Sequence, residues 1–427
     1  MSNKIKKDLM YNYLSLLVLG SSGVLINIII GKFAGVEVLG VFNQLFTLYL
    51  IVSQFTVLGV QFSLLKYLSQ FKAENKPIDE LITGAFIAAL VCSLIVIAPI
   101  GLFASQIAQI FNSEAVLENI YYLLPAIFLF GINKVFINVL NGCRKMVSFG
   151  VCQALRMVFI LIGVSLITAL EMAVKWIVFP LLLSEMLMTL ILLLSVLKCF
   201  DFRINVHAIK WVKIHVYYGF KGVLNGGVSE LNSRIDVLVI GVFLSDTAVG
   251  IYTMASTVVE GMMQIPAIIR NVINPILSEY WFSKSKIDFK GFVQSVITKT
   301  YIAFVAVGIL SIAAYMTLVY GLLGHEFIDS VPIFIILTCG LILSSGLMPL
   351  DMLLIQLGYP IFQSSYKGVV MLINILLNIV FIQSYGLAGV AMATAISFVS
   401  GSLLLSYILT AIILPKHPSI SSLESER

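Results

Sequence analysis

The sequence is poor in charge. Only 11% of its 427 residues are Asp, Glu, Lys or Arg, 60% are hydrophobic, and the mean hydropathy is +1.05. Soluble domains are about one quarter charged, and a soluble fold of this length needs far more polar surface. The composition excludes an ordinary soluble protein and predicts a chain that crosses a membrane many times.

The sequence also lacks the motifs of common enzymes, pumps and metal sites. It contains no GxxxxGK[ST] phosphate-binding loop, no HExxH zinc motif and no GxSxG nucleophile motif. The cysteines form no CxxC pair, and we expect them to be small buried hydrophobic side chains: Cys92, Cys143, Cys152, Cys199 and Cys339. The sequence therefore predicts a protein that is not an enzyme and needs no metal or other cofactor.

Long apolar runs fill almost the whole chain. A membrane-spanning helix needs about twenty mostly apolar residues, and the following segments meet this length: 11–31, 38–60, 81–104, 118–141, 149–170, 174–197, 217–243, 248–272, 292–317, 329–350, 365–384 and 387–414. The first run is too long for a signal peptide and lacks a cleavage site, so we expect it to be retained. The predicted fold class is an all-α polytopic membrane protein with about twelve transmembrane helices.

The loops predict an orientation. Lys and Arg cluster in alternate connections, near residues 4–7, 66–76, 198–213 and 284–290, whereas the connections between them hold mainly acidic residues. Because basic residues stay on the cytoplasmic side, both termini are predicted to be cytoplasmic. The net charge of +5 is then a topology signal, and no nucleic-acid partner is expected.

Two short segments predict an internal repeat. GKFAGVEVLGVF and GVFLSDTAVGIY match at one constant offset, which pairs Gly31, Phe33, Gly40 and Phe42 with Gly241, Phe243, Gly250 and Tyr252. Each segment is the outer turn after the first helix of a six-helix half. The repeat predicts two parallel six-helix bundles, residues 1–200 and 201–427, which is an architecture of transporters.

Charges inside the spans are the most informative residues, because each one costs about 2.5–3.5 kcal/mol near the middle of a bilayer. In NSRIDVLVIGVF, Arg234 stands four residues after Glu230, a spacing that allows an ion pair on one helix face. Asp236 points to another face and needs another partner. Arg234 either completes a structural pair with Glu230 or lines a cavity, where its planar fork suits phosphate or carboxylate oxygens.

A second group of basic and amide residues lies in the fourth and fifth spans. Lys134, Asn138, Asn141 and Lys145 recur at helical spacing and form one polar stripe, which either packs on a neighbouring helix or lines a cavity. Lys134 is too deep to reach the inner headgroups easily. Arg156 either snorkels to the cytoplasmic interface or joins the same cavity.

Acidic residues and helix breakers complete the candidates. Glu185 is also an intramembrane charge, but its spacing assigns it no role. Four carboxylates are candidates for ion coupling or for balancing a buried cation: Asp236, Glu260, Glu230 and Asp351. We expect Asn225-Gly226-Gly227, Gly261, Pro266 and Pro275 to interrupt the two spans beside the second repeat segment.

Three stretches resemble one family. Residues 234–280 resemble the seventh and eighth helices of bacterial polysaccharide-repeat-unit (O-antigen, Wzx-like) flippases, which belong to the MATE/polysaccharide flippase (MOP) superfamily. This similarity rests on Asp236, Gly241, the VGIY turn at 249–252, Pro266 and Pro275. Residues 374–397 resemble the closing N…YGxxGAAxAT signature of the family through Asn378, Tyr385, Gly386, Gly389, Ala391, Ala393 and Thr394, with Val390 where Ala is frequent. GVEVLGVFNQ resembles the first outer turn.

The resemblance implies a fold of the MATE type and a function. The implied cargo is an undecaprenyl-diphosphate-linked oligosaccharide, moved from the cytoplasmic to the periplasmic leaflet of the bacterial inner membrane for O-antigen or a related surface polysaccharide. The implied partners are this glycan lipid, the bilayer, and polysaccharide polymerase and chain-length proteins. A diphosphate favours the deep cations Arg234, Lys134 and Arg156, and a glycan favours amides such as Asn138, Asn141, Asn27 and Asn43.

Two other functions stay open at this point. A MATE-type cation-coupled multidrug exporter has the same architecture, but a cavity for organic cations favours acidic and aromatic groups over Lys and Arg. A scaffold subunit of a polysaccharide synthesis complex has no reason to keep charges in the middle of its spans. The sequence therefore favours a flippase that works by alternating access through a basic cavity.

Overall fold

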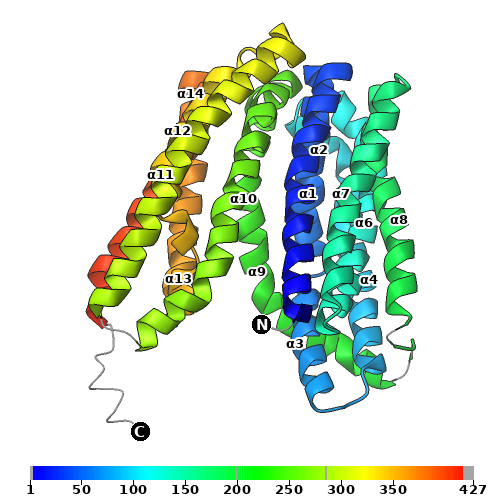
Figure 1. The fold of residues 1–427 in the computed structure, drawn as a ribbon. Helices are drawn as coiled ribbons and strands as arrows, with labels where there is room; N and C mark the ends of the chain where they lie inside the picture. Colours follow the sequence, from blue (N-terminus) through cyan, green and yellow to red (C-terminus); the bar gives the residue numbers. More distant parts are fainter. Residues whose placement is uncertain (1–2, 199, 203, 205, 284–285, 417–427) are drawn as a thin grey trace. The chain divides into compact units, whose positions relative to one another are not determined.

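A computed structural model describes residues 3–198, 200–202, 204, 206–283 and 286–416. Within these ranges the ordered elements are helices and no strand is present (Figure 1). The all-α prediction is therefore confirmed. The packing of the chain divides it into two units, Met1–Thr253 and Met254–Arg427. The division at residue 200 stays a prediction, because it rests on the internal repeat and not on packing.

Unit 1 is a helical bundle with an aliphatic core. Its helices are α1 (Asn3–Phe33), α2 (Val36–Thr56), α3 (Val60–Ala73), α4 (Asp79–Leu102), α5 (Ala104–Ile110), α6 (Glu114–Gly142), α7 (Met146–Ala169), α8 (Phe179–Val196), α9 (Val206–Phe243) and the first turns of α10 (Asp246–Ser283). Helix α1 packs on α7, α6 packs on α8 and α4, and α9 packs on α2, α3 and α4. Helix α6 therefore lies among α2, α4 and α8, and the amides of Asn119 and Asn133 on it are buried away from lipid.

Unit 2 contains the rest of α10, followed by α11 (Lys286–Leu318), α12 (Ser330–Ser345), α13 (Leu353–Gln356) and α14 (Pro360–Tyr407). Helix α12 packs against both α11 and α14. A second aliphatic and aromatic core joins α10, α13 and α14 around Leu277, Trp281, Leu353 and Leu405.

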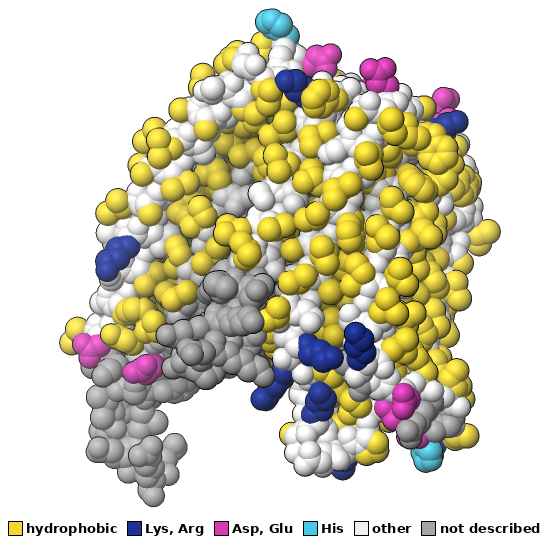
Figure 2. Space-filling model, turned by 45° about the vertical axis from the view of Figure 1, so that its right-hand side comes forward, with side chains coloured by type: hydrophobic (Ala, Val, Ile, Leu, Met, Phe, Trp, Pro, Cys, Tyr) yellow, Lys and Arg dark blue, Asp and Glu magenta, His cyan; other side chains and the backbone are white. Residues whose placement is uncertain are grey.

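The helices have the length and composition that a bilayer requires. Among the described residues, seven helices are long and apolar enough to cross a membrane, or eight when a bent pair counts as one span. On the face shown in Figure 2, hydrophobic side chains cover the middle, and most charged side chains lie toward the upper and lower ends. The chain is a multi-pass membrane protein. The cytoplasmic placement of its termini stays a prediction, and residues 1–2 and 417–427 lie outside the described part.

The predicted interruptions in α9 and α10 are wrong. Both helices continue through Asn225-Gly226-Gly227, Gly261, Pro266 and Pro275. A proline removes one backbone donor and clashes with the preceding turn, but membrane helices tolerate this where local adjustment satisfies the freed carbonyl.

The real breaks lie elsewhere. The helical segments Ser330–Ser345 and Met348–Gln356 meet at an angle of 61°. Within α14, Gly386 has φ 57° and ψ −135°, a conformation that a residue with a Cβ rarely adopts. This glycine falls in the predicted gap between the spans 365–384 and 387–414, so that gap is confirmed.

The two repeat segments touch each other inside unit 1. A Cβ on Gly40 would lie 1.8 Å from the carbonyl oxygen of Asp246, and a Cβ on Gly250 would lie 2.0 Å from the carbonyl oxygen of Val36. Gln44 Nε2 also donates to Asp246 Oδ1 at 2.7 Å. Equivalent positions of the repeat thus meet reciprocally, and only glycine permits this approach of the backbones of α2 and α10.

Candidate functional site

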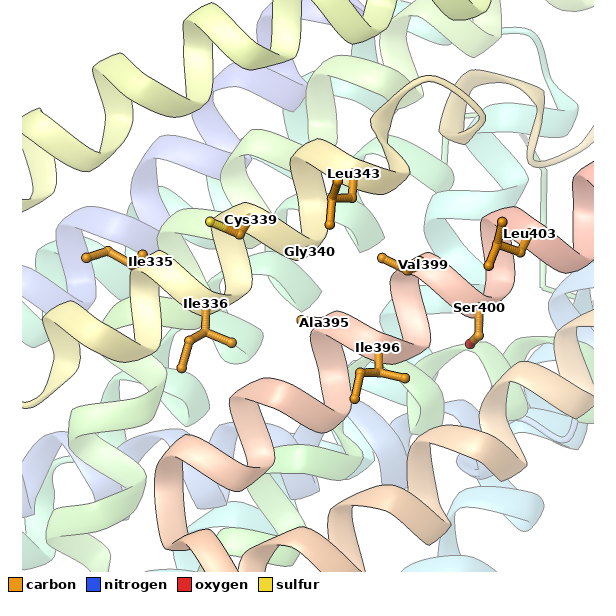
Figure 3. A pocket seen from close by; sticks show the side chains of 10 residues that line it. All are labelled: Ile335, Ile336, Cys339, Gly340, Leu343, Ala395, Ile396, Val399, Ser400 and Leu403. Carbon is orange, nitrogen blue, oxygen red and sulfur yellow. The ribbon is translucent and has the colours of Figure 1, made fainter.

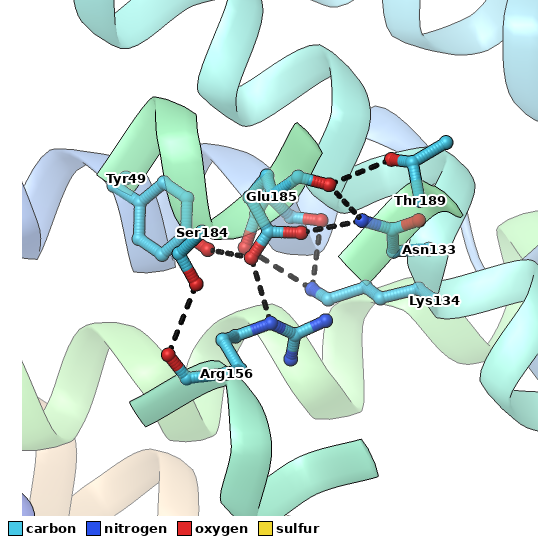
Figure 4. Close-up of polar contacts among 8 residues, drawn as sticks. Tyr49, Asn133, Lys134, Arg156, Ser184, Glu185 and Thr189 are labelled. Atoms are coloured by element: carbon cyan, nitrogen blue, oxygen red, sulfur yellow. Dashed lines mark hydrogen bonds and ion pairs between the residues drawn. The ribbon is translucent and has the colours of Figure 1, made fainter. Parts of the chain in front are cut away.

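A buried carboxylate lies at the centre of the main polar cluster of unit 1. Glu185, on α8, is fully buried. Tyr49 Oη donates to its Oε1 at 2.5 Å, Asn133 Nδ2 donates to its Oε2 at 2.7 Å, and Arg156 Nε lies 2.7 Å from Oε1 (Figure 4). These partners come from α2, α6 and α7, so the cluster joins four helices. A buried charge needs such partners to be tolerated.

The local packing fixes Arg156. Ser184 Oγ donates to the Arg156 carbonyl at 3.0 Å, which ties α8 to the backbone of α7. The guanidinium carbon lies 4.2 Å from the centre of the Phe130 ring. Its Nη2 atom is buried and makes no hydrogen bond to the described residues. Arg156 therefore keeps donor capacity beyond its pairing with Glu185.

Lys134 is the second cation of the cluster. Its Nζ lies 4.7 Å from the centre of the same Phe130 ring, so the two cations share one aromatic ring. Lys134 Nζ donates to the Ser53 carbonyl at 2.8 Å, to Ser53 Oγ at 3.1 Å and to Gln54 Oε1 at 3.1 Å. All of these acceptors are neutral, and among the described residues Lys134 forms no ion pair with a carboxylate.

The charges of this cluster do not cancel. We define the basic cluster as Lys134, Arg156 and Glu185, which carries two cations and one carboxylate in their ordinary charged forms. A surplus positive charge inside a span is costly unless an anion or water compensates it. The Arg156 guanidinium and the Lys134 ammonium lie close together over the Phe130 ring, so one anion can interact with both.

Gln54 connects the basic cluster to Glu230 and Arg234. Its Oε1 accepts from Lys134, and its Nε2 donates to Glu230 Oε2 at 3.4 Å. Arg234 Nε lies 3.7 Å from Glu230 Oε1, and the Arg234 guanidinium carbon lies 5.8 Å from the centre of the Phe46 ring. The structure thus brings Lys134, Arg156, Glu230 and Arg234 into one connected network. Arg234 is paired with Glu230, as its spacing allowed.

Asp236 has the separate partner that its position on the helix required. Tyr252 Oη donates to its Oδ2 at 2.5 Å, and its own carboxylate accepts from the Val237 backbone N–H at 2.9 Å. The side chain is 8% exposed. Asp236 therefore ties the end of α9 to the start of α10 and does not contact the basic cluster.

The predicted amide residues do not gather around the cations. Asn43 Nδ2 donates to Asn27 Oδ1 at 2.7 Å, and both side chains are buried, so this pair joins α1 to α2. Asn138 Nδ2 donates back to the Lys134 carbonyl at 2.8 Å. Asn141 is half-buried one turn nearer the end of α6. The role of these residues in glycan binding stays a prediction.

Two of the candidate carboxylates belong to unit 2. Asp351 follows the bend after α12, and its carboxylate pairs with Arg270 Nη1 at 3.5 Å and with the Lys367 ammonium. Gln363 Nε2 donates to the Asp351 carbonyl at 2.8 Å. This geometry fits charge balance, because two cations already occupy the carboxylate. Glu260 is half-buried on α10.

Unit 2 contains an apolar cavity, in contrast to the charged basic cluster of unit 1. It has a volume of about 470 Å³ and lies between α12 and α14 (Figure 3). Its lining is aliphatic apart from Cys339 and Ser400, and it contains no charged residue. Cys339 is exposed there, contrary to the expectation of a buried thiol. Cys92 and Cys152 are buried, Cys143 is half-buried, and Cys199 lies outside the described residues.

The sequence did not identify the residues that hold the cluster together. Glu185 stands out in the sequence as an intramembrane charge, but its spacing indicates no role, and no motif marks Tyr49 or Asn133. The available signal was weak, because a phenol and an amide in apolar helices need partners when buried, but the pattern does not name those partners.

Comparisons with known proteins agree on a fold and a family. The structure superimposes on the lipid II flippase MurJ in an inward closed conformation with a TM-score of 0.76 and 18% identity, covering 95% of this chain and 87% of the other. It also superimposes on an inward-facing multidrug resistance MATE family transporter of the MOP superfamily with a TM-score of 0.74 and 15% identity, covering 95% and 96%. These similarities show the fold alone.

A sequence relative is the "Probable low-salt glycan biosynthesis flippase Agl15" of Haloferax volcanii, 26% identical over 182 residues. The match covers 42% of this chain and 38% of that relative, so the chain aligns with well under half of it. A family model described as "Polysaccharide biosynthesis protein" matches residues 45–332. That range holds the whole basic cluster, most of unit 1 and the first part of unit 2, and it spans more than half of the chain. The chain accordingly belongs to the polysaccharide biosynthesis protein family.

Proposed function

We propose that this protein is a flippase for a lipid-linked oligosaccharide. The cargo carries its glycan on undecaprenyl diphosphate and moves from the cytoplasmic to the periplasmic leaflet of a bacterial inner membrane. The product serves the assembly of O-antigen or a related surface polysaccharide. A polymerase and a chain-length protein then act on the flipped units. Transport is by alternating access, and the polyprenyl tail stays in lipid.

The observation that carries the proposal is the surplus cation of the basic cluster. Lys134 and Arg156 share the Phe130 ring, and Glu185 offsets only one of them. A diphosphate supplies the missing negative charge and offers several oxygens to the donors that remain on Arg156. Membership of the polysaccharide biosynthesis protein family and the flippase among its relatives support a glycan cargo.

The net positive charge of the basic cluster favours a flippase over a multidrug exporter. The fold does not distinguish the two functions, because both a flippase and a MATE transporter superimpose on the chain. An organic cation would meet a site with an excess of positive charge, and like charges at short range inside a low-dielectric region repel strongly. The basic cluster therefore favours an anionic cargo.

Complementation of a flippase-deficient bacterium tests the proposal. Wild-type protein should restore surface glycan, and Lys134→Ala should lower the amount by about tenfold or more at equal membrane level, because a charge-assisted contact contributes about 1.5–3 kcal/mol. Lys175→Ala is the matched control, since Lys175 is exposed outside the cluster and should have no effect. Normal glycan with Lys134→Ala and Arg156→Ala, both stably inserted, would rule out the basic site.

A further inference from the structure

The first part of α9, residues 206–220, has two different faces. Its buried residues, among them Ala208 and His215, fall on one side of the helix. The exposed residues recur at spacings of three and four on the opposite side. We define the lysine face as Ile209, Lys210, Lys213, Ile214, Tyr217 and Phe220.

The buried side fixes this segment on unit 1. The Trp211 ring centre lies 5.3 Å from that of Tyr67 and 5.3 Å from that of Phe71, both on α3. His215 Nε2 donates to the Leu81 carbonyl at 3.0 Å, which ties α9 to α4. The lysine face is therefore held in one orientation, pointing away from α3 and α4.

The lysine face is apolar and basic. Ile209, Tyr217 and Phe220 are 59%, 68% and 64% exposed, and Lys210 and Lys213 are also exposed. The sequence from 206 to 229 contains no Asp or Glu. A helix face that meets water carries mainly polar side chains, whereas large apolar residues beside lysines are typical of a helix that lies in a membrane interface.

The place of the segment in the fold agrees with an interface. Helix α9 runs without a break from Val206 to Phe243, and its later part carries Arg234. The start of α9 lies beside α3 at the lower end of unit 1 (Figure 1), and Lys and Arg side chains gather at the lower end in Figure 2. On α3, the Lys66 ammonium lies 4.4 Å from the centre of the Tyr218 ring and adds a third cation at the flank of the segment.

We infer that the lysine face binds acidic phospholipids of the leaflet at this end of the molecule. The Lys210 and Lys213 ammonium groups contact the lipid phosphates, and Ile209, Ile214 and Phe220 enter the boundary of the acyl chains. An acidic phospholipid has a net negative charge that a zwitterionic lipid lacks, so the lysines favour the acidic one. The partner is a lipid of the bilayer and not the cargo, so this inference does not depend on the proposed function.

The test is lipid binding to the purified full chain in detergent, followed by native mass spectrometry. The probes are phosphatidylglycerol and phosphatidylcholine, and wild-type protein should bind the first several-fold more tightly. Lys210→Ala with Lys213→Ala should lower the affinity for phosphatidylglycerol by about tenfold or more, because each lysine near an anionic lipid surface contributes about fivefold. Glycerol phosphate, the soluble headgroup, should not compete, because it has no acyl chains.

Two further variants serve as controls. Lys210→Arg with Lys213→Arg keeps both charges and should retain the wild-type affinity. Lys72→Ala with Lys175→Ala removes the same charge from exposed positions outside α9 and should leave the affinity unchanged. An equal loss in this second control would show that net charge, and not the lysine face, determines lipid binding.

The apolar residues have a separate test. Ile209→Ser with Ile214→Ser should weaken binding of both lipids alike, because contact with acyl chains does not depend on the headgroup. Equal affinity for phosphatidylglycerol in wild-type protein and in Lys210→Ala with Lys213→Ala would overturn the inference. Competition by glycerol phosphate would also overturn it, in favour of a soluble phosphate ligand. Each of these outcomes leaves the flippase proposal intact, since neither probe is a glycan lipid.

Discussion

Two carboxylate–arginine pairs among the described residues of unit 1 differ in almost every physical respect. Glu185 and Arg156 join α8 to α7 at 2.7 Å, and their side chains are 0% and 14% exposed. Glu230 and Arg234 join adjacent turns of α9 at 3.7 Å, and theirs are 23% and 18% exposed. The first pair depends on tertiary packing, whereas the second is formed within one helix.

The sequence pattern indicates the Glu230–Arg234 pair, but the buried Glu185–Arg156 pair should matter more for stability. A buried pair is not by itself a large net gain, but removal of one partner leaves an uncompensated charge and costs about 3–5 kcal/mol. A partly exposed pair at (i, i+4) contributes less than about 1 kcal/mol. The two pairs should therefore respond very differently to the same substitution.

Arg156→Met should give the largest effect. The substitution leaves the Glu185 carboxylate buried beside Tyr49 and Asn133 without its cation, so the free energy of unfolding should fall by about 3–5 kcal/mol. Denaturant unfolding of the purified protein in detergent measures the change. The double variant Arg156→Met with Glu185→Met should recover most of the loss, because no unpaired charge then remains. A double variant as unstable as Arg156→Met would contradict this account of the pair.

Tyr49→Phe should give an intermediate effect. The substitution keeps the ring that stacks on Phe130 at 4.7 Å and removes only the hydroxyl that donates to Glu185. A hydrogen bond to a charged group contributes about 1.5–3 kcal/mol, so stability should fall by that amount. Tyr121→Phe is the matched control, since Tyr121 is 58% exposed and should not respond. The same unfolding measurement decides, and equal stability of the two variants would show that the Tyr49 hydroxyl does not hold the carboxylate.

Arg234→Met should give the smallest effect on stability, below about 1 kcal/mol. The Glu230 carboxylate retains the Gln54 amide and access to water, so losing Arg234 leaves no buried unpaired charge. Unfolding measured beside Arg156→Met provides the direct comparison. A loss as large as that of Arg156→Met would mean that the (i, i+4) pair is as important to the fold as the buried one.

The parts of the molecule that could be predicted from sequence are those that depend on local pattern. Apolar length located the helices, and the (i, i+4) spacing gave the Glu230–Arg234 pair. The position of Asp236 on a different helix face predicted a separate partner, which is Tyr252. The gap between the last two spans was also correct, because the conformation at Gly386 is a property of that residue alone.

The parts that could not be predicted depend on which helices meet. Glu185 finds Tyr49 and Asn133 only because α8 packs on α6 and α6 packs on α2, and these contacts join residues far apart in the chain. The prediction that prolines interrupt α10 was wrong for a related reason. A proline weakens a helix locally, but whether the helix breaks depends on what surrounds it, as the unbroken course through Pro266 shows.

The reciprocal contact at Gly40 and Gly250 has an evolutionary consequence. Because Val36 faces Gly250 and Asp246 faces Gly40, the same pair of positions meets twice, as it does across the two-fold axis of a symmetric dimer. Two separate copies of an ancestral half-length chain could close this contact without any change of sequence. Fusion of such copies would let the two segments diverge in sequence. The equivalent positions Val36 and Asp246, which now hold different residues, are a divergence of this kind.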